Sequence, residues 1–387
     1  MKPLYLLICL LSFLSSCSYF KNVGLLLGGE VIRENYVQTL PFTLRKDLIV
    51  VNARLNDDTA SHAFIFDTGA FNSKVEYSLA DKLKLEVVSQ KTNSTAQANS
   101  RRIEVARVDS LQLGETWFYN IGAGKLSYDS ASASRCVAGS GIIGANLMKL
   151  AHWKIDFQNQ QLYFSDSPFE VDDQSHSLDF DRPLLSGTPE IEVNINGRRV
   201  QHVLLDVGYN GGLVLPISLA DQFESPEQQI ILDHSTSGIY GTSTDSLIVK
   251  KLSVEVAGHQ DEVPVEFSSL NKALLGNAFL RHFTLTIDYD EEKIYLAKQQ
   301  EVLVATPRSF HVGVLDDTRW IVNRTRPDLP LSLGDTLLSV NGKLPQELFT
   351  SYCDYFMNIH QLFERDTLVV QRSDGDFLTI KNESVFP

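Results

Sequence analysis

The sequence is poor in cysteine and in basic residues, and each shortage excludes a class of protein. Four cysteines in 387 residues are too few for a fold held together by a disulfide framework. Lys and Arg number 34 against 48 Asp and Glu, and the net charge of −14 argues against nucleic acid or an anionic lipid surface as the main partner. The nine histidines show no His-Glu-x-x-His spacing, and neither a Walker loop nor a Gly-x-Ser-x-Gly turn is present. The sequence therefore predicts no cofactor and no metal.

The N-terminal residues predict a signal segment that is separate from the fold. Lys2 precedes an apolar run from Leu4 to Leu14, which is too short to span a bilayer and fits the core of a signal peptide. The run ends in Leu-Ser-Ser-Cys at Cys17, which resembles the lipobox of bacterial lipoproteins. That resemblance implies that Cys17 carries a lipid and becomes the mature N-terminus. The alternative is a plain secretory signal with a chance cysteine.

We therefore expect a signal peptide at residues 1–17, a linker at residues 18–33, and a protein anchored by lipid to a membrane of a bacterial cell envelope, on the periplasmic or surface side. Removal of the signal and acylation leave Cys136 and Cys353, which lie far apart in the sequence. A disulfide between them is one alternative, but we expect none.

An internal repeat organises most of the chain. The segment FIFDTGAFNSKVEYSLADKL at residues 64–83 matches VLLDVGYNGGLVLPISLADQF at residues 203–223. Upstream of each lies a strand, a polar turn and a second strand, and downstream GIIGANLMKLAHWKIDF matches LLGNAFLRHFTLTIDY. The same landmarks in the same order predict two homologous units, residues 34–168 and 169–304. An acidic, turn-rich stretch at residues 169–181 is the expected linker between them.

Each copy of the repeat has a mostly β pattern, with short runs of Val, Ile, Thr, Phe and Tyr between turn residues. Short helices are expected at Ser78–Leu83, at Ser218–Phe223, and after Gly144 and Gly276. The first copy also holds an extra segment, about Tyr119–Cys136, which is rich in Ser, Ala and Gly and is predicted to be a surface loop.

This arrangement resembles the bilobed aspartyl proteases, and the Asp-Thr-Gly-Ala sequence resembles their retropepsin-like branch. Asp67-Thr68-Gly69 matches the catalytic loop of that family, and Asp206-Val207-Gly208 occupies the same place in the second copy. Gly141–Gly144 and Leu274–Gly276 match the apolar element that passes beneath each loop. The resemblance covers about residues 34–304 and implies a mostly β fold, with two homologous lobes that form a cleft and with Asp67 and Asp206 as the catalytic pair.

The chemistry of the family explains why these residues are needed. Without a metal or a covalent nucleophile, peptide hydrolysis requires one carboxylate to activate water and one carboxyl to protonate the carbonyl. Two carboxyls about 3 Å apart cannot both ionise, so they share a proton. Glycine is required at positions 69 and 208, because a Cβ there would obstruct the approach. Ala70 follows the first loop and has no hydroxyl to donate to a carboxylate.

Val207 departs from the family pattern, which has Thr or Ser at that place. Its β-branched shape is kept, but it cannot donate the hydrogen bond that the family makes across the lobe interface, while Thr68 still can. The alternative to an enzyme is therefore a lapsed protease fold that serves as a peptide-binding or scaffolding lipoprotein. Asp156 and Asp288 are also matched between the copies, and their place before polar turns predicts a role in stabilising hairpins.

Residues 305–387 depart from the repeat and form a C-terminal module. The run from Leu333 to Gly342 resembles the Leu-x-x-Gly-Asp-x-Ile-x-x-Val-Asn-Gly signature of PDZ domains. A helix at Leu348–Phe363 and a hairpin of Thr367–Val370 with Phe377–Ile380 are expected to follow. The resemblance implies a small α+β PDZ-like domain, which could take the C-terminus of a peptide by adding it as a strand, or could only pack on the lobes.

Taken together, these residues predict an aspartic endopeptidase that hydrolyses peptide bonds with a water activated by the Asp67–Asp206 pair. Thr68, Gly69, Ala70, Val207 and Gly208 are the expected supports of the pair. The expected partners are a peptide or protein substrate and a membrane reached through the lipid anchor, with no nucleic acid. Because one chain supplies both aspartates, we expect a monomer.

Overall fold

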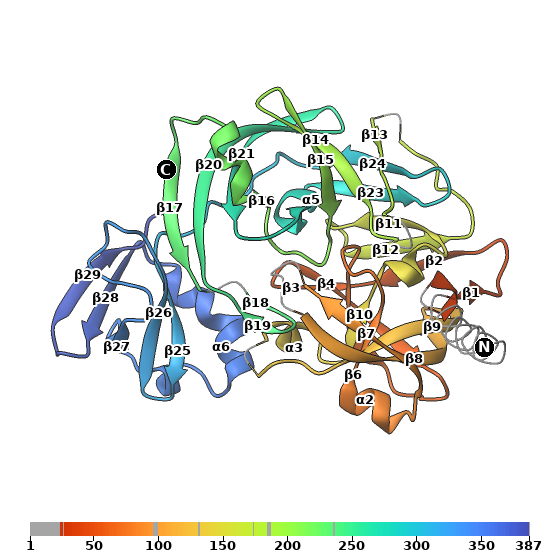
Figure 1. Cartoon of the computed structure of the whole chain (residues 1–387), viewed down its shortest axis with the longest axis horizontal. Helices are drawn as coiled ribbons and strands as arrows, with labels where there is room; N and C mark the ends of the chain where they lie inside the picture. Colours follow the sequence, from red (N-terminus) through yellow and green to blue (C-terminus); the bar gives the residue numbers. More distant parts are fainter. Residues whose placement is uncertain are drawn as a thin grey trace, which may run out of the picture.

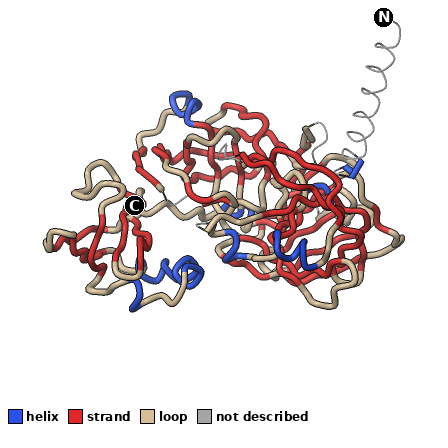
Figure 2. The backbone as a smooth tube through the Cα atoms, turned by 60° about the horizontal axis from the view of Figure 1, so that its bottom comes forward, coloured by secondary structure: helices blue, strands red, loops and turns tan. Residues whose placement is uncertain are grey.

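The computed structural model describes residues 24–25, 27–95, 100–130, 132–172, 174–183, 187–234 and 237–386. The predicted signal peptide and Cys17 lie outside the described residues. The described chain is mostly β, which confirms the predicted fold class. Figure 1 shows two β-rich lobes side by side, with the C-terminal residues as a smaller body at one end, and Figure 2 shows the same separation from a second direction. Within the described residues, no helix has the length and apolar character needed to cross a membrane.

The first copy of the repeat folds around one large sheet. In spatial order its strands are β1 (Glu30–Val31), β9 (Thr116–Leu126), β6 (Lys74–Glu76), β10 (Gly141–Ile143), β5 (His62–Phe66), β4 (Leu48–Leu55), β8 (Ser100–Leu113) and β7 (Glu86–Ser94), and β3 (Thr43–Arg45) also pairs with β4. Three short helices accompany them: α2 (Tyr77–Lys82), α3 (Ser134–Val137) and α4 (Ala145–Met148). Strand β10 runs parallel to β5, which places it under the loop that follows Phe66.

The second copy repeats this layout. Its strands are, in spatial order, β14 (Glu190–Ile195), β15 (Arg198–Leu205), β22 (Ala273–Leu275), β16 (Leu213–Pro216), β21 (His259–Ser268), β20 (Asp245–Val256) and β17 (Gln228–Asp233). Strand β22 runs parallel to β15, as β10 does to β5. The short helices η1 (Ile217–Gln222) and α5 (Asn277–Leu280) stand where α2 and α4 stand in the first copy. The two copies of the sequence repeat therefore have the same strand order and the same strand directions.

A separate sheet joins the two lobes. Its strands are, in spatial order, β13 (His176–Asp179), β24 (Lys293–Lys298), β23 (Phe283–Asp288), β11 (His152–Asp156), β12 (Gln161–Ser165) and β2 (Val37–Pro41). Its central pairing is antiparallel and crosses the lobes, with Trp153 opposite Ile287 and Ile155 opposite Leu285. The stretch predicted as a linker is thus partly an edge strand, β13, because its alternating His-Ser-Leu-Asp can pair with β24.

The main core is continuous through both lobes and this joining sheet. Trp153 is fully buried at its centre, and the ring centroids of Phe66 and Phe164 each lie 5.0 Å from its own. Phe66 is the residue before Asp67, so the loop of the first aspartate rests directly on this core. Burying such aromatic side chains contributes about 2–3 kcal/mol each. The position of the loop is therefore fixed by fully buried aromatic side chains.

The C-terminal module is a small sheet with a broken helix. Its elements are β25 (His311–Asp316), β26 (Arg319–Thr325), β27 (Thr336–Val340), η2 (Pro345–Glu347), α6 (Tyr352–Asn358), η3 (Ile359–Phe363), β28 (Thr367–Arg372) and β29 (Phe377–Lys381). Gly334, Asn341 and Gly342 all have positive φ, a conformation that glycine and asparagine adopt readily in turns. The module continues the sheet of the second lobe, because β26 pairs with β17. At this seam the buried carboxylate of Asp233 binds Nε of Arg324 at 2.7 Å.

The structure corrects three predictions. Cys136 and Cys353 are joined in a disulfide, which links α3 of the first lobe to α6 of the module. The predicted surface loop Tyr119–Cys136 begins as the inner strand β9, and Leu126, Ser132 and Ala133 are buried beyond it. Sequence reasoning missed this strand because the Gly and Ala that are typical of a loop here allow close packing against β8 and β6. The predicted helix Leu348–Phe363 is interrupted, since Ser351 caps α6 by accepting from the amide of Asp354.

Candidate active site

Asp67 and Asp206 occupy matched loops at the ends of matched strands. Asp67 follows β5, and its amide donates to the carbonyl of Ile143 at 3.0 Å. Asp206 follows β15, and its amide donates to the carbonyl of Leu275 at 2.9 Å. In both cases the acceptor lies on the parallel strand predicted to pass beneath the loop. The apolar-apolar-Gly element is short and buried, so it fixes the height of each aspartate above the core.

The two loops approach each other until the side chain of each aspartate lies against the glycine of the other loop. A Cβ placed on Gly69 would overlap the carboxyl of Asp206, and a Cβ placed on Gly208 would overlap the carboxyl of Asp67. Any other residue at either position would push the loops apart. The structure therefore brings together the two aspartates that the sequence matched, with glycine at the positions where glycine is needed.

Asp67 and Asp206 are half-buried, and their carboxyls share a side-chain hydrogen bond. Burial raises the pKa of Asp67, and it raises the pKa of Asp206 further because the charge of Asp67 adds to it. Backbone donors oppose the shift: the amide of Ala70 donates to Oδ1 of Asp67 at 2.8 Å, and that of Gly208 donates to Oδ1 of Asp206 at 2.8 Å. The pair therefore holds one proton more firmly than isolated carboxyls would.

Thr68 connects the two loops across the lobe interface. Its buried hydroxyl donates to the carbonyl of Leu205 at 2.6 Å and accepts from the amide of Val207 at 3.0 Å. Val207 has no hydroxyl, so it cannot make the equivalent bonds to the first loop, as the sequence predicts. Its carbonyl instead accepts from Nδ2 of Asn277 at 2.7 Å, and the same amide group donates to the carbonyl of Asp47 in the first lobe at 2.7 Å. Asn277 therefore supplies a second bridge between the lobes beside the incomplete one.

Two hairpins meet near the aspartates. One is the β7–β8 hairpin of the first lobe. The other extends from β17 and β20 and ends in β18 (Ser237–Gly238) and β19 (Gly241–Thr242), which lie beside α3 in Figure 1. The hydroxyl of Tyr240, at the tip of the second hairpin, accepts from Nδ2 of Asn93 at 2.8 Å, and Arg101 lies over its ring at 4.7 Å. Tyr240 is buried in one cluster with Ala70. The described structure thus has its hairpins closed over the first loop.

The other matched acids have the structural role that their sequence context predicts. Oδ1 of Asp156 accepts from the amide of Asn159, and Oδ1 of Asp288 accepts from the amides of Asp290 and Glu291. Both carboxylates stabilise hairpin turns. Within the described ranges, no group of three or more His, Cys, Asp or Glu side chains is placed to hold a metal ion.

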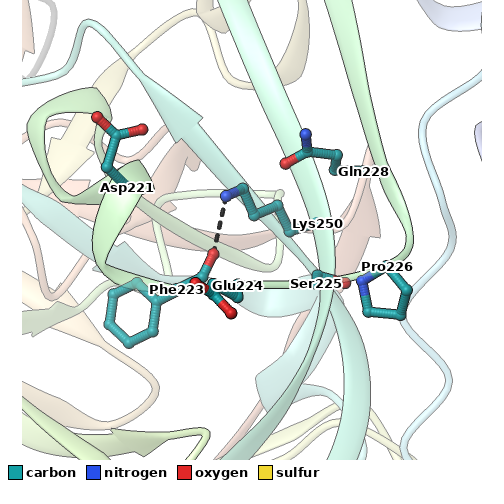
Figure 3. Close-up of a pocket in the computed structure, with 7 residues that line it drawn as sticks. All are labelled: Asp221, Phe223, Glu224, Ser225, Pro226, Gln228 and Lys250. Carbon is teal, nitrogen blue, oxygen red and sulfur yellow. Dashed lines mark hydrogen bonds between the residues drawn. The ribbon is translucent and has the colours of Figure 1, made fainter.

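A surface hollow of the second lobe lies apart from these loops (Figure 3). Its lining residues are Asp221, Phe223, Glu224, Ser225, Pro226, Gln228 and Lys250. The ammonium of Lys250 donates to the carbonyls of Ala220 at 3.0 Å and Phe223 at 2.8 Å, so it holds η1 against β20. Lys250 and Phe223 of the hollow therefore have a role in packing.

Residues 51–147 match the model of the aspartyl protease family. The matched segment contains the Asp67 loop and β10, and it stops before the second copy of the repeat. No curated protein matches the chain. The match supports an aspartyl protease type of fold for the first lobe, and the layout of the second lobe extends that fold by its repeated strand order.

Sequence reasoning missed several residues of the site. Asn277 directly follows the Leu-Leu-Gly element and could have been found as a polar residue in a buried position. Lys74 is a charged residue inside the apolar strand that follows the first loop, and it is only 5% exposed. Tyr240 gave no signal, because the contact between the two hairpins depends on how the lobes meet.

Proposed function

We propose that the protein is an aspartic endopeptidase that uses Asp67 and Asp206 as its acid–base pair. The observation that carries the proposal is the mutual approach of the two carboxyls, each against the glycine of the opposite loop. A water held between them loses a proton to the ionised carboxyl while its oxygen bonds to the scissile carbon. The other carboxyl protonates the carbonyl oxygen. The tetrahedral intermediate then breaks its C–N bond as the amine takes up a proton.

The electrostatics of the site assign the roles of the two aspartates. Burial raises the pKa of both groups, and the positive charge of Lys74 opposes that rise at Asp67. Asp206 lacks such a cation among the groups that act on it most strongly and has Asp67 beside it, so its pKa is the higher one. Asp67 is thus the base that activates water, and Asp206 is the acid that protonates the carbonyl. Substrate entry requires the contact of Tyr240 with Asn93 to open.

The test is cleavage of a mixed peptide library by the purified chain, with and without pepstatin. We expect cleavage that pepstatin inhibits and that Asp67→Asn abolishes, while Asp156→Asn, which changes a matched acid outside the site, retains it. A chain that binds the peptides but cleaves none would reject the enzyme and favour the lapsed protease. That alternative rests on Val207, which leaves the interface one hydroxyl short.

The location of the protein and the role of its C-terminal module are further proposals. We propose that Cys17 carries a lipid and anchors the protein to a membrane of a bacterial envelope. Cys17→Ala should release the protein from sedimented membranes, and mass spectrometry should find the lipid on the wild-type N-terminus. A mutant that still sediments would remove this proposal.

For the module, the PDZ-like interpretation is supported by the positive-φ turns at Gly334 and Asn341 and by a broken helix beside β25. The hydroxyl of Tyr355 lies against β25, beside Gly313 and Val314. A peptide that adds to β25 would have to displace this side chain, so packing against the lobes is the role that the contacts favour.

A further inference from the structure

Two lysine side chains converge beside the loop of Asp67. Lys74 lies on β6, and its ammonium donates to the carbonyl of Asn72 at 3.3 Å. Lys91 lies on β7, and its ammonium donates to the side-chain oxygen of the same Asn72. Lys91 also lies 5.0 Å from the centre of the Phe71 ring. Phe71 and Asn72 directly follow Ala70, and Lys91 lies on β7. The cluster therefore lies between the catalytic loop and strand β7.

Other buried lysines of the chain have the acceptors that an ammonium needs. Lys250 has two backbone carbonyls at 3.0 and 2.8 Å (Figure 3). Lys125 has the carboxylates of Asp81 at 2.6 Å and Glu104 at 3.0 Å. Among the described residues, no carboxylate lies within ion-pair distance of Lys74 or Lys91. An ammonium has three protons to donate, and leaving them unpaired away from water costs free energy. A purely structural lysine would be expected to have partners of the kind that Lys125 has.

Asn72 adds a donor with no acceptor. It is 1% exposed, its Nδ2 group is buried, and within the described part of the chain no hydrogen-bond partner meets that group. Its orientation follows from Lys91, which can donate only to the oxygen of the amide. Two ammonium groups and one unpartnered amide N–H group therefore gather at Asn72, where no carboxylate of the described residues lies within ion-pair distance of either ammonium. All of these groups favour an acceptor, and the two ammonium groups favour one with a negative charge.

The charges of the neighbourhood point the same way. The singly protonated aspartate pair carries one negative charge. The two lysines carry two positive charges when both are protonated, which leaves one positive charge over and is opposed by burial, since burial lowers the pKa of Lys74. Asp67 attracts Lys74 from a distance, but its oxygens already accept from Ala70 and face Asp206. Burial, and to a smaller extent the charge of Lys74, lowers the pKa of Lys91 to about 8, so the two ammonium groups repel each other. A bound anion would remove that repulsion.

We propose that Lys74, Lys91 and Asn72 form a substrate subsite that binds a carboxylate of the peptide next to the scissile bond. This inference rests on the proposed peptidase function and adds a preference for acidic substrates to it. The carboxylate is that of an Asp or Glu side chain, or the C-terminal carboxylate of a short peptide, and the chemistry of the subsite is the same for both. The acidic surface of the protein, with its net charge of −14, makes such a local cationic site the feature that would admit an acidic peptide.

The experiment compares kcat/KM for paired peptides that differ only by Glu or Gln, with the exchange made at each position around the scissile bond in turn. A second pair differs only by a free or an amidated C-terminus. We expect a preference for the carboxylate at one position on the order of tenfold, the size of one charge-assisted hydrogen bond. A preference that appears only for the free C-terminus assigns the subsite to the terminal carboxylate.

Variants then test which residue causes the preference for the carboxylate. Lys91→Met should abolish it, and Lys91→Arg, which keeps the charge, should retain most of it. Lys82→Met is the matched control, because it removes the same charge from an exposed site on α2 of the same lobe. An active enzyme with equal rates for both members of every pair, or with a preference that Lys91→Met leaves unchanged, would overturn the subsite and leave the peptidase function intact.

Binding gives a readout that does not depend on turnover. Calorimetry of the same peptides with Asp206→Asn should show the same preference for the carboxylate, lost again in the double variant with Lys91→Met. If the wild type cleaves nothing but this preference is found, the peptidase function fails and the subsite stands. If Glu and Gln peptides bind equally, the subsite is rejected whether or not the chain is an enzyme.

Discussion

Ionisation of the Asp206 carboxyl lowers the stability of the folded chain. Burial, together with the charge of Asp67, raises its pKa well above the ordinary value. A group with a raised folded-state pKa contributes stability that is fully present below its unfolded pKa and that is lost as the pH rises through the folded pKa. Wild-type stability should therefore contain a loss towards neutral pH that originates in this one carboxyl.

Replacing Asp206 by Asn removes this loss. We expect the Tm of Asp206→Asn minus that of the wild type to increase from about pH 4 to neutral pH, because only the wild type has the proton to lose. The same change should lower kcat/KM by about 10²–10⁴-fold, the usual contribution of a general acid. Thermal unfolding across the pH range is the measurement, with the exposed Asp57→Asn as the matched control. A difference in Tm that falls as the pH rises would contradict the assignment.

Ala70 contributes to how readily the aspartate pair ionises. Its backbone amide reaches Asp67, but its methyl group has no donor to add. Tyr209 stands at the matched place in the second loop, and its hydroxyl lies against Gly211. A serine at position 70 could donate a further hydrogen bond to the ionised carboxylate, which favours the charged form and lowers its pKa.

We therefore expect Ala70→Ser to move the pH profile of kcat/KM towards acid. The profile of the wild type, measured beside Ala70→Gly as a control without a hydroxyl, provides the comparison. If the serine variant has an unchanged profile or one displaced towards alkaline pH, the missing donor does not set the pKa of the pair.

At the scale of elements, the hydroxyl of Thr68 bonds to the loop of Asp206 and joins the two aspartate loops. Thr68→Val should destabilise the protein by about 1–3 kcal/mol, because the buried carbonyl of Leu205 and the amide of Val207 both lose their partner. Val207→Thr is the reciprocal change, and by the symmetry of the loops it should stabilise the protein by about 1 kcal/mol. Denaturant unfolding with a constant slope would measure both. Equal and small effects of the two changes would show that the interface is insensitive to these bonds.

The sequence was informative where local pattern and position determine the outcome. The repeat and the turns at Asp156 and Asp288 follow from patterns within the sequence, and the element beneath each aspartate follows from the resemblance to the aspartyl proteases. The contacts that close the site do not. The bond of Tyr240 to Asn93 and the bridge of Asn277 to Asp47 join residues of different lobes, and nothing in either segment alone specifies its partner.

The interrupted helix of the module shows the same limit within one element. Apolar residues from Leu348 to Phe363 recur at helical spacing, which predicts one helix. Ser351 and Asp354 form a cap inside that run, and a cap signal competes with a periodicity signal in any single sequence. The disulfide of Cys136 with Cys353 was missed for a third reason, since spacing along the chain contains no information on which domains touch.

At the scale of the whole molecule, the module is attached to both lobes. Strand β26 pairs with β17 of the second lobe, and the disulfide ties α6 to α3 of the first. The module therefore connects the hairpin that carries Tyr240 to the lobe on which Tyr240 packs. Opening of the site for a substrate has to occur with this connection in place.

Reduction of the disulfide should weaken the molecule without unfolding the module. Cys136 and Cys353 are 217 residues apart, and a link that closes so long a loop contributes about 2–5 kcal/mol. We expect Cys353→Ser to lower Tm, and we expect a reductant to lower the Tm of the wild type but to have no effect on that variant. A wild type whose Tm is the same with and without reductant would show that the link contributes nothing to stability.

The sheet shared by the two lobes has a consequence for folding during synthesis of the chain. Trp153 of β11 pairs opposite Ile287 of β23, which is synthesised a full repeat later. Until then the first lobe has an open strand edge next to its largest buried ring, and such an edge is a template for pairing with other chains. Closing a pairing of such long range is slow, because the loop entropy is lost before the contacts form. We therefore expect the second copy of the repeat to protect the first from aggregation, in addition to supplying the second aspartate.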